Sequence, residues 1–265
     1  MAVPNNIDVD DVLALFGQIT DRAAEVVVAT TEWGESGQRP GQYLVDLDVD
    51  EVCVRPLLAA GFSVLSEESG LQPPDGTSSS GSASGCVVVD PLDGSTNASL
   101  GLPWCATSLC LVVDGEPQVA MVTNLVTGQR WTAIRGSGAT LDGCPISIGR
   151  ADGDVAVESV DIADAIVAVS GLPPRHAGWR QFRAMGASAL DICSVASGTF
   201  DAFVDMSPDA HGVWDYLGGL LVVREAGGVV VDAVGRELVV LDHEARRTPV
   251  AATSEGLLIE LLAHR

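Results

Sequence analysis

The chain has 265 residues, 47% of them hydrophobic, which is enough for one large α/β domain or two small ones with a sizeable core. Its formal net charge is −22 and its 14 basic residues are all arginine, which argues against nucleic acid and anionic membrane surfaces as partners. The first residues, MAVPNNIDVDD, lack the basic and apolar regions of a signal peptide, and no apolar run reaches membrane-spanning length. We therefore expect a cytoplasmic protein.

The cysteines indicate a reduced protein. None of the six falls in a C-x-x-C pair, and most lie within apolar runs, so we interpret them as reduced core residues rather than as a disulfide or metal set. They are Cys53, Cys86, Cys105, Cys110, Cys144 and Cys193.

The first half of the chain predicts two helices followed by strands. Apolar residues at helical spacing predict a helix over residues 8–32, and a second is expected over 46–58 although Pro56 lies inside it. Turn signals separate the predicted strands, and a low-complexity loop occupies residues 73–85. The strands are expected at 62–65, 86–89, 107–113, 118–126 and 129–133. The last three form an antiparallel meander, because Asp-Gly and Thr-Gly turns join them.

The second half predicts a mixture of strands and helices. Strands are expected at 165–170, 200–205, 228–231 and 249–252. Helices are expected at 177–185, 190–197, 214–226 and 255–263. The mixture indicates layered sheets and helices rather than a simple parallel βαβ repeat. We expect a single domain over residues 1–265, with one half at about 1–150 and the other at about 151–265.

One motif, VVVDPLDGSTN at residues 87–97, carries the clearest chemistry. Its three valines predict a buried strand, and Asp90 and Asp93 follow at the carboxyl end. Two buried negative charges are costly unless a cation is bound there. Gly94 allows the backbone to turn, and Ser95 and Thr96 favour the start of a helix, where backbone N–H groups bind anions. The motif predicts a metal site beside a phosphate site.

Other interpretations of the acidic motifs fit less well. The haloacid-dehalogenase nucleophile motif has one residue between its aspartates, whereas two separate Asp90 and Asp93. A plain Asp-Gly turn needs neither the second carboxylate nor the Ser-Thr pair. The aspartates at 46, 48 and 50 resemble a calcium loop, but Glu51 and Leu57 stand where an EF-hand needs glycine and glutamate. Glu67-Glu68 and Asp215, taken alone, are typical of a solvated strand edge and of a helix start.

Taken in order, several motifs resemble the inositol monophosphatase family. They are S-E-E at 66–68, D-P-L-D-G-S-T-N at 90–97, R-G-S-G-A at 135–139, G-A-S-A-L-D at 186–191, F-D-A-F at 200–203, W-D at 214–215 and E-A-G-G at 225–228. The resemblance covers residues from about 46 to 228. It implies the layered αβαβα sandwich of the inositol monophosphatase and fructose-1,6-bisphosphatase type, with the metal motifs in the N-terminal half.

The resemblance also implies two or three Mg²⁺ ions. Glu67, Asp90 and the carbonyl of Leu92 would hold one ion, and Asp90, Asp93 and Asp215 would hold a second. A third, weaker ion would lie near Glu67. Oxygen ligands suit Mg²⁺, which keeps several of its waters.

Catalytic and substrate-binding roles follow from the same resemblance. The catalytic residues would be Glu67, Ser95 and Asp46, with Ser95 and Asp46 orienting the attacking water; Asp48 and Asp50 compete with Asp46 for this role. The substrate-binding residues would be Asp93, Gly94, Ser95, Thr96, Gly186, Ala187, Ser188 and Asp205.

The function implied is a Mg²⁺-dependent phosphomonoesterase acting through a metal-activated water on a small phosphorylated polyol such as inositol 1-phosphate, in a homodimer. Fructose bisphosphate, histidinol phosphate and 3′-phosphoadenosine phosphate are competing substrates, and a catalytically silent metal-binding regulatory relative is the alternative from another class. The chain departs from the family in three ways: Ser66 replaces a usual glycine, Arg39 is the only local substitute for an early lysine, and the stretch before Trp214 is long. His211, in that stretch, is expected at the surface.

Overall fold

The computed structural model describes residues 8–74, 85–148 and 160–265, so most of the low-complexity loop predicted at 73–85 lies outside the described residues. The helices are α1 (Val9–Ala29), α2 (Leu44–Ala59), α3 (Ser95–Ser99), α4 (Ser188–Ala196), α5 (Val213–Glu225) and α6 (Glu255–His264). The strands are β1 (Ser63–Ser66), β2 (Gly70–Gln72), β3 (Cys86–Asp93), β4 (Ala106–Val113), β5 (Glu116–Asn124), β6 (Arg130–Ile134), β7 (Gly138–Leu141), β8 (Cys144–Ile146), β9 (Ile166–Ser170), β10 (Gln181–Arg183), β11 (Ala202–Asp205), β12 (Val229–Asp232) and β13 (Pro249–Ala252).

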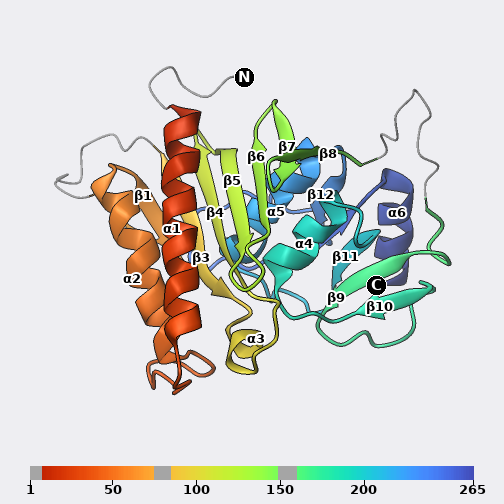
Figure 1. The fold of residues 1–265 in the computed structure, drawn as a ribbon. Helices are drawn as coiled ribbons and strands as arrows, with labels where there is room; N and C mark the ends of the chain where they lie inside the picture. Colours follow the sequence, from red (N-terminus) through yellow and green to blue (C-terminus); the bar gives the residue numbers. More distant parts are fainter. Residues whose placement is uncertain (1–7, 75–84, 149–159) are drawn as a thin grey trace.

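The larger sheet has eight strands in the order β2-β1-β3-β4-β5-β6-β7-β8. Strands β1 and β3 pair in parallel, and β3 pairs antiparallel with β4. Strands β4 to β6 form the antiparallel meander that the turn signals predict. Helices α1 and α2 cover one face of this sheet (Figure 1), where Phe16, Ile19 and Leu57 are buried against Val87 and Leu109. Each such side chain stabilises the fold by about 1.5–3 kcal/mol.

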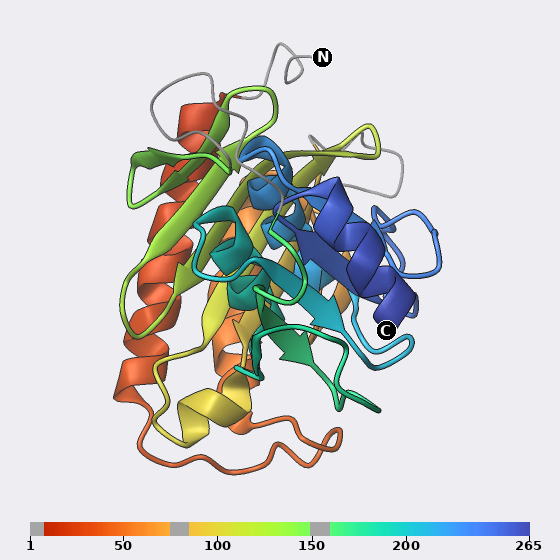
Figure 2. The same cartoon turned by 90° about the vertical axis from the view of Figure 1, so that its right-hand side faces the viewer.

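The smaller sheet has five strands in the order β10-β9-β11-β13-β12. Helix α6 covers its outer face (Figure 2). Leu257 and Leu261 of this helix are buried in one cluster with Val167 and Val250 of the sheet. Helices α4 and α5 lie between the two sheets and contact both. The layers are therefore α, β, α, β, α, which confirms the fold class predicted from the sequence.

The helix predicted at 177–185 is wrong, because this segment contains the short strand β10, which pairs in parallel with β9. Ala177 and Trp179 are both buried, a spacing of two that suits an extended chain, whereas Phe182 and Arg183 are exposed. The strands β2, β7 and β8 were not predicted. The other predicted helices and strands are present, with ends that differ by up to a few residues.

Five of the six cysteines are buried, as the sequence predicts, but Cys144 is exposed on β8. All six are free thiols. Within the described residues, no helix is long and apolar enough to cross a membrane.

Candidate metal centre and active site

The carboxyl end of β3 carries the acidic part of the site. The strand extends to Asp93, beyond the predicted end, and its pairing with β4 shifts register between Asp90 and Asp93. This bulge bends the strand so that both aspartates face the start of α5. Ligand atoms of Asp90, Asp93 and Asp215 all lie within 4.8 Å of one another. The structure thus brings together three of the metal ligands predicted from the sequence.

These three carboxylates fit a divalent cation. Asp90 is 0% exposed, and neither of its oxygens has a hydrogen-bond partner among the described residues. Asp93 accepts one bond from the N–H of Ala189 at 2.7 Å, and Asp215 accepts one from Gly212 at 2.6 Å. Unpaired buried carboxylate oxygens are expensive, and hard cations prefer such ligands.

Electrostatics in the metal-free site favour the protonated carboxyl groups. Burial, then repulsion from Glu67 and Asp93, raises the pKa of Asp90 well above its usual value. Burial and the repulsion of Asp215 raise the pKa of Asp93 in the same way. A bound cation would reverse this balance, because it stabilises the charged forms.

Glu67 lies beside this cluster but outside the set of three. Its carboxylate pairs with Arg39 at 3.0 Å, and its backbone carbonyl accepts a hydrogen bond from His243 at 2.9 Å. Burial, then repulsion from Asp215 and Glu68, raises the pKa of Glu67 to about 8. Arg39 also pairs with Glu68, so the carboxylates of Glu67 and Glu68 both hold this guanidinium group.

Asp46 is better placed than its two competitors to orient a water. A cavity of about 270 Å³ is lined by Asp46, Glu67, Leu92 and Ser95 among other residues. One carboxylate oxygen of Asp46 accepts a bond from the N–H of Tyr43 at 2.7 Å, and the other is buried with no hydrogen-bond partner in residues 8–74, 85–148 and 160–265. Burial raises the pKa of Asp46 to about 6.

The two competing aspartates lie in less suitable surroundings. Asp50 accepts a hydrogen bond from the hydroxyl of Ser66. Asp48 is exposed on the outside of α2. Neither residue lines the cavity that contains Ser95.

The glycine turn packs against the segment at 186–188. Gly94 has φ +83°, and a Cβ atom there would lie 2.9 Å from the carbonyl of Trp104, 3.1 Å from the Cβ of Ala187 and 3.2 Å from the carbonyl of Gly186. Only glycine fits this position without displacement. The predicted phosphate-binding and polyol-binding segments therefore lie side by side, although more than 90 residues separate them in the sequence.

His211 is buried, contrary to the surface position expected from the sequence. It is 6% exposed and lies between the hydroxyl of Ser188, at 2.7 Å, and the carboxylate of Asp205, at 2.8 Å. Asp205 is 0% exposed, and its other oxygen accepts a bond from the N–H of Ser207 at 2.8 Å. The predicted direct contact between Asp205 and the substrate does not fit this burial, because both of its oxygens are engaged.

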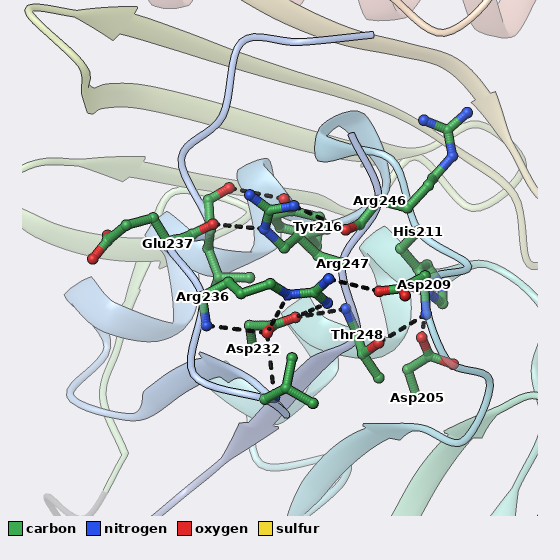
Figure 3. Close-up of polar contacts among 12 residues, drawn as sticks. Asp205, Asp209, His211, Tyr216, Asp232, Arg236, Glu237, Arg246, Arg247 and Thr248 are labelled. Carbon is green, nitrogen blue, oxygen red and sulfur yellow. Dashed lines mark hydrogen bonds and ion pairs between the residues drawn. The ribbon is translucent and has the colours of Figure 1, made fainter. Parts of the chain in front are cut away.

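The loop that carries His211 is held by ion pairs and backbone bonds (Figure 3). Arg236 pairs with Asp232 at 2.8 Å and with Asp209 at 2.7 Å, and His211 exchanges two backbone hydrogen bonds with Arg247 at 2.8 and 3.2 Å. The sequence holds one signal that His211 lies near the site: it stands only four residues before Asp215.

A five-layer αβαβα sandwich, with two carboxylates at the end of β3 facing a third at the start of α5, places the protein in the inositol monophosphatase and fructose-1,6-bisphosphatase fold class. The profile of the inositol monophosphatase family matches residues 29–264, and the chain belongs to that family.

Individual relatives agree with this assignment. A Solanum lycopersicum protein named inositol monophosphatase 3 is 37% identical over 177 residues, which span 64% of this chain and 63% of that relative's length. A Thermococcus kodakarensis protein named fructose-1,6-bisphosphatase/inositol-1-monophosphatase is 31% identical over 219 residues, or 82% of this chain and 80% of the relative. The crystal structure of extragenic suppressor protein suhB from Bartonella henselae superposes with a TM-score of 0.77 at 26% identity, covering 96% of this chain and 98% of that chain.

Proposed function

We propose that this protein is a Mg²⁺-dependent phosphomonoesterase that hydrolyses a small phosphorylated polyol such as inositol 1-phosphate. The observation that carries the proposal is the group formed by Asp90, Asp93 and Asp215, in which Asp90 is buried and neither of its oxygens has a hydrogen-bond partner in the part of the chain that the structure describes. Family membership supports the same chemistry. The printed names of the relatives include both inositol and fructose phosphatases, so fructose bisphosphate remains a competing substrate.

The proposed ligands are those suggested by the resemblance, and their burial and charge support them. Glu67, Asp90 and the Leu92 carbonyl would hold one Mg²⁺, and Asp90, Asp93 and Asp215 a second, with a third near Glu67. Bound Mg²⁺ would supply the positive charge that this acidic site lacks and would acidify water.

The chain's own groups would then orient the reactants. Asp46 and Ser95 line the same cavity, and one carboxylate oxygen of Asp46 has no hydrogen-bond partner among the described residues, so the two side chains would hold the attacking water. The backbone N–H groups of Gly94, Ser95 and Thr96, at the start of α3, would bind the phosphate oxygens. The segment at 186–188, packed against Gly94, would contact the alcohol portion of the substrate.

Phosphate release tests the proposal directly. The panel would contain inositol 1-phosphate, fructose 1,6-bisphosphate, histidinol phosphate and 3′-phosphoadenosine phosphate, each assayed with and without Mg²⁺. We expect Mg²⁺-dependent release, and at least a hundredfold lower kcat for Asp93→Asn, since electrostatic groups of this kind contribute about 10²–10³. Asp48→Asn, which removes an exposed carboxylate, is the matched control and should behave as the wild type. Turnover without metal, or none on any ester with Mg²⁺, contradicts the proposal.

A further inference from the structure

A short segment at residues 242–247, between β12 and β13, links two of the proposed metal ligands. Nε2 of His243 lies 2.9 Å from the backbone carbonyl oxygen of Glu67. The imidazole ring of His243 also lies against the indole ring of Trp214, with 4.9 Å between the ring centroids and 33° between the ring planes. Trp214 is buried and directly precedes Asp215. His243 therefore contacts one proposed ligand and the sequence neighbour of another.

The hydrogen bond from His243 to Glu67 has a fixed direction. A carbonyl oxygen can only accept, so the imidazole carries a proton on Nε2 and His243 is the donor. Nδ1 lies 3.5 Å from the carboxylate of Glu244, whose side chain is exposed to solvent. A neutral imidazole is sufficient for the bond to Glu67. Another side chain with an N–H group in the place of Nε2 could therefore make it, whereas an aromatic hydrocarbon could not.

The segment that carries His243 is anchored on both sides of this residue's contacts. The guanidinium carbon of Arg246 lies 5.1 Å from the centroid of the Trp214 ring, a cation–π contact, and Nη1 of Arg246 donates to the carbonyl of His243 at 2.7 Å. The backbone of Arg247 exchanges hydrogen bonds of 2.8 and 3.2 Å with that of His211. The position of the imidazole is thus set by its own segment and by Trp214.

The two ligands that this contact links come from different layers and repel each other. Glu67 directly follows β1 of the larger sheet, whereas Asp215 lies in α5 of the central helical layer. Among the charged groups around Glu67, Asp215 raises its pKa most. A contact that spans the two layers opposes this repulsion and keeps both carboxylates near one cation. Groups that orient metal ligands without touching the metal typically change metal affinity by about 10–100-fold.

We propose that His243 is a positioning residue of the metal centre, which holds Glu67 and Asp215 at the spacing at which both bind Mg²⁺. It acts through its hydrogen bond to the Glu67 carbonyl, and the Trp214 ring sets the place of the imidazole. The inference rests on the proposed function and deepens it, because it adds the segment 242–247 to the parts of the chain that determine Mg²⁺ affinity.

Two substitutions separate the hydrogen bond from the ring contact. His243→Phe keeps an aromatic ring against Trp214 but has no donor for Glu67, while His243→Gln keeps an N–H group near the place of Nε2. Isothermal titration calorimetry, after dialysis against a chelator, measures the Kd for Mg²⁺. His243→Phe should raise this Kd by about tenfold, the lower end of the usual range, because the contact is with the backbone of the ligand. His243→Gln should stay close to the wild-type Kd.

His176→Phe is the matched control, because it makes the same replacement beside a different tryptophan, Trp179, at 5.8 Å between ring centroids. It should keep the wild-type Kd. Each variant is titrated at a temperature at which circular dichroism shows it to be folded. A purely structural role of His243 would then lower Tm without changing the Kd.

The outcomes separate this inference from the proposed function. If His243→Phe binds Mg²⁺ with the wild-type Kd, or if His243→Gln binds it as weakly as His243→Phe, the positioning role alone is overturned. A wild type that binds no Mg²⁺ and releases no phosphate from any phosphomonoester would overturn the proposed function together with this inference.

Discussion

Without metal, the carboxylate cluster should make the protein less stable as the pH rises, and Asp90→Asn should remove part of this dependence. Burial and the repulsion of Glu67 and Asp93 hold the pKa of Asp90 well above its usual value. In the unfolded chain the same carboxyl ionises near its ordinary pKa of about 4. Between these two values the folded protein binds one more proton than the unfolded chain. The contribution of Asp90 to stability is therefore complete at low pH and decreases as the pH rises.

The size of the effect follows from proton linkage. Each carboxyl that is protonated only in the folded state lowers the free energy of unfolding by about 1.4 kcal/mol per pH unit. Glu67, with a pKa raised to about 8, and Asp93 act in the same direction. Asparagine cannot ionise, so over each pH unit in which Asp90 is protonated only in the folded state, Asp90→Asn should lose about 1.4 kcal/mol less stability than the wild type. In a chain of this size, that corresponds to a difference of roughly 3–6 °C in the change of Tm per pH unit.

Thermal unfolding at pH 5, 6 and 7, after dialysis against a chelator, measures this difference. Asp48→Asn, on α2, replaces an exposed aspartate and should keep the wild-type slope. Adding Mg²⁺ at a hundred times its Kd should stabilise the wild type by about 2.7 kcal/mol and should act much less on Asp90→Asn. A metal-free wild type whose Tm is constant or rises from pH 5 to pH 7 would refute the reasoning, as would parallel profiles for the wild type and Asp90→Asn.

Two further substitutions test the scaffold of the site. Gly94→Ala should lower Tm by roughly 4–8 °C, because the positive φ and the 2.9 Å approach to the carbonyl of Trp104 together cost about 2 kcal/mol. Gly101→Ala is the control: Gly101 has φ +73° but open space around it, so the substitution should cost only about half as much. Arg236→Ala should destabilise the folded protein by about 3 kcal/mol at neutral pH, because it leaves the buried carboxylate of Asp232 without its cation. Differential scanning calorimetry measures this loss, with Arg135→Ala, which removes the partly exposed ion pair to Glu116, as the comparison. Hydrogen bonds from Arg236 and Thr248 outweigh burial and lower the pKa of Asp232. The contribution of the ionised Asp232 to the free energy of unfolding should therefore be lost as the pH falls below about 4. An Arg236→Ala destabilisation that is the same at pH 3 and pH 7 would contradict this.

The metal motif could be predicted from sequence because its chemistry is local. Asp90 and Asp93 follow a run of valines, so burial and charge could both be inferred from adjacent residues. The helix predicted at 177–185 is wrong because the structure of this segment depends on distant residues. Its apolar residues fit more than one periodicity, and the pairing of β10 with β9, which decides the matter, depends on residues more than ten positions away.

His211 was missed for a related reason. A single histidine in a loop gives no periodic signal, and its partners Ser188 and Asp205 lie in different elements. Burial of the loop depends on Arg236 and Arg247, which come later in the chain. The one local indication of its burial is therefore its position four residues before Asp215.

On the proposed function, the arrangement of layers separates metal binding from contact with the alcohol portion of the substrate. The larger sheet supplies Asp90 and Asp93, and the central helical layer supplies Asp215 from α5 and Ser188 from α4. The segment after β11 then places His211 beside Ser188, and the next residue, Gly212, donates its N–H to the carboxylate of Asp215. The bonds from Ala189 to Asp93 and from Gly212 to Asp215 connect the two sets, so the part of the loop before Gly212 can vary while these bonds hold the carboxylate geometry fixed. On the proposed function, leaving-group preference should be changed by substitutions in that loop, and the requirement for metal should not.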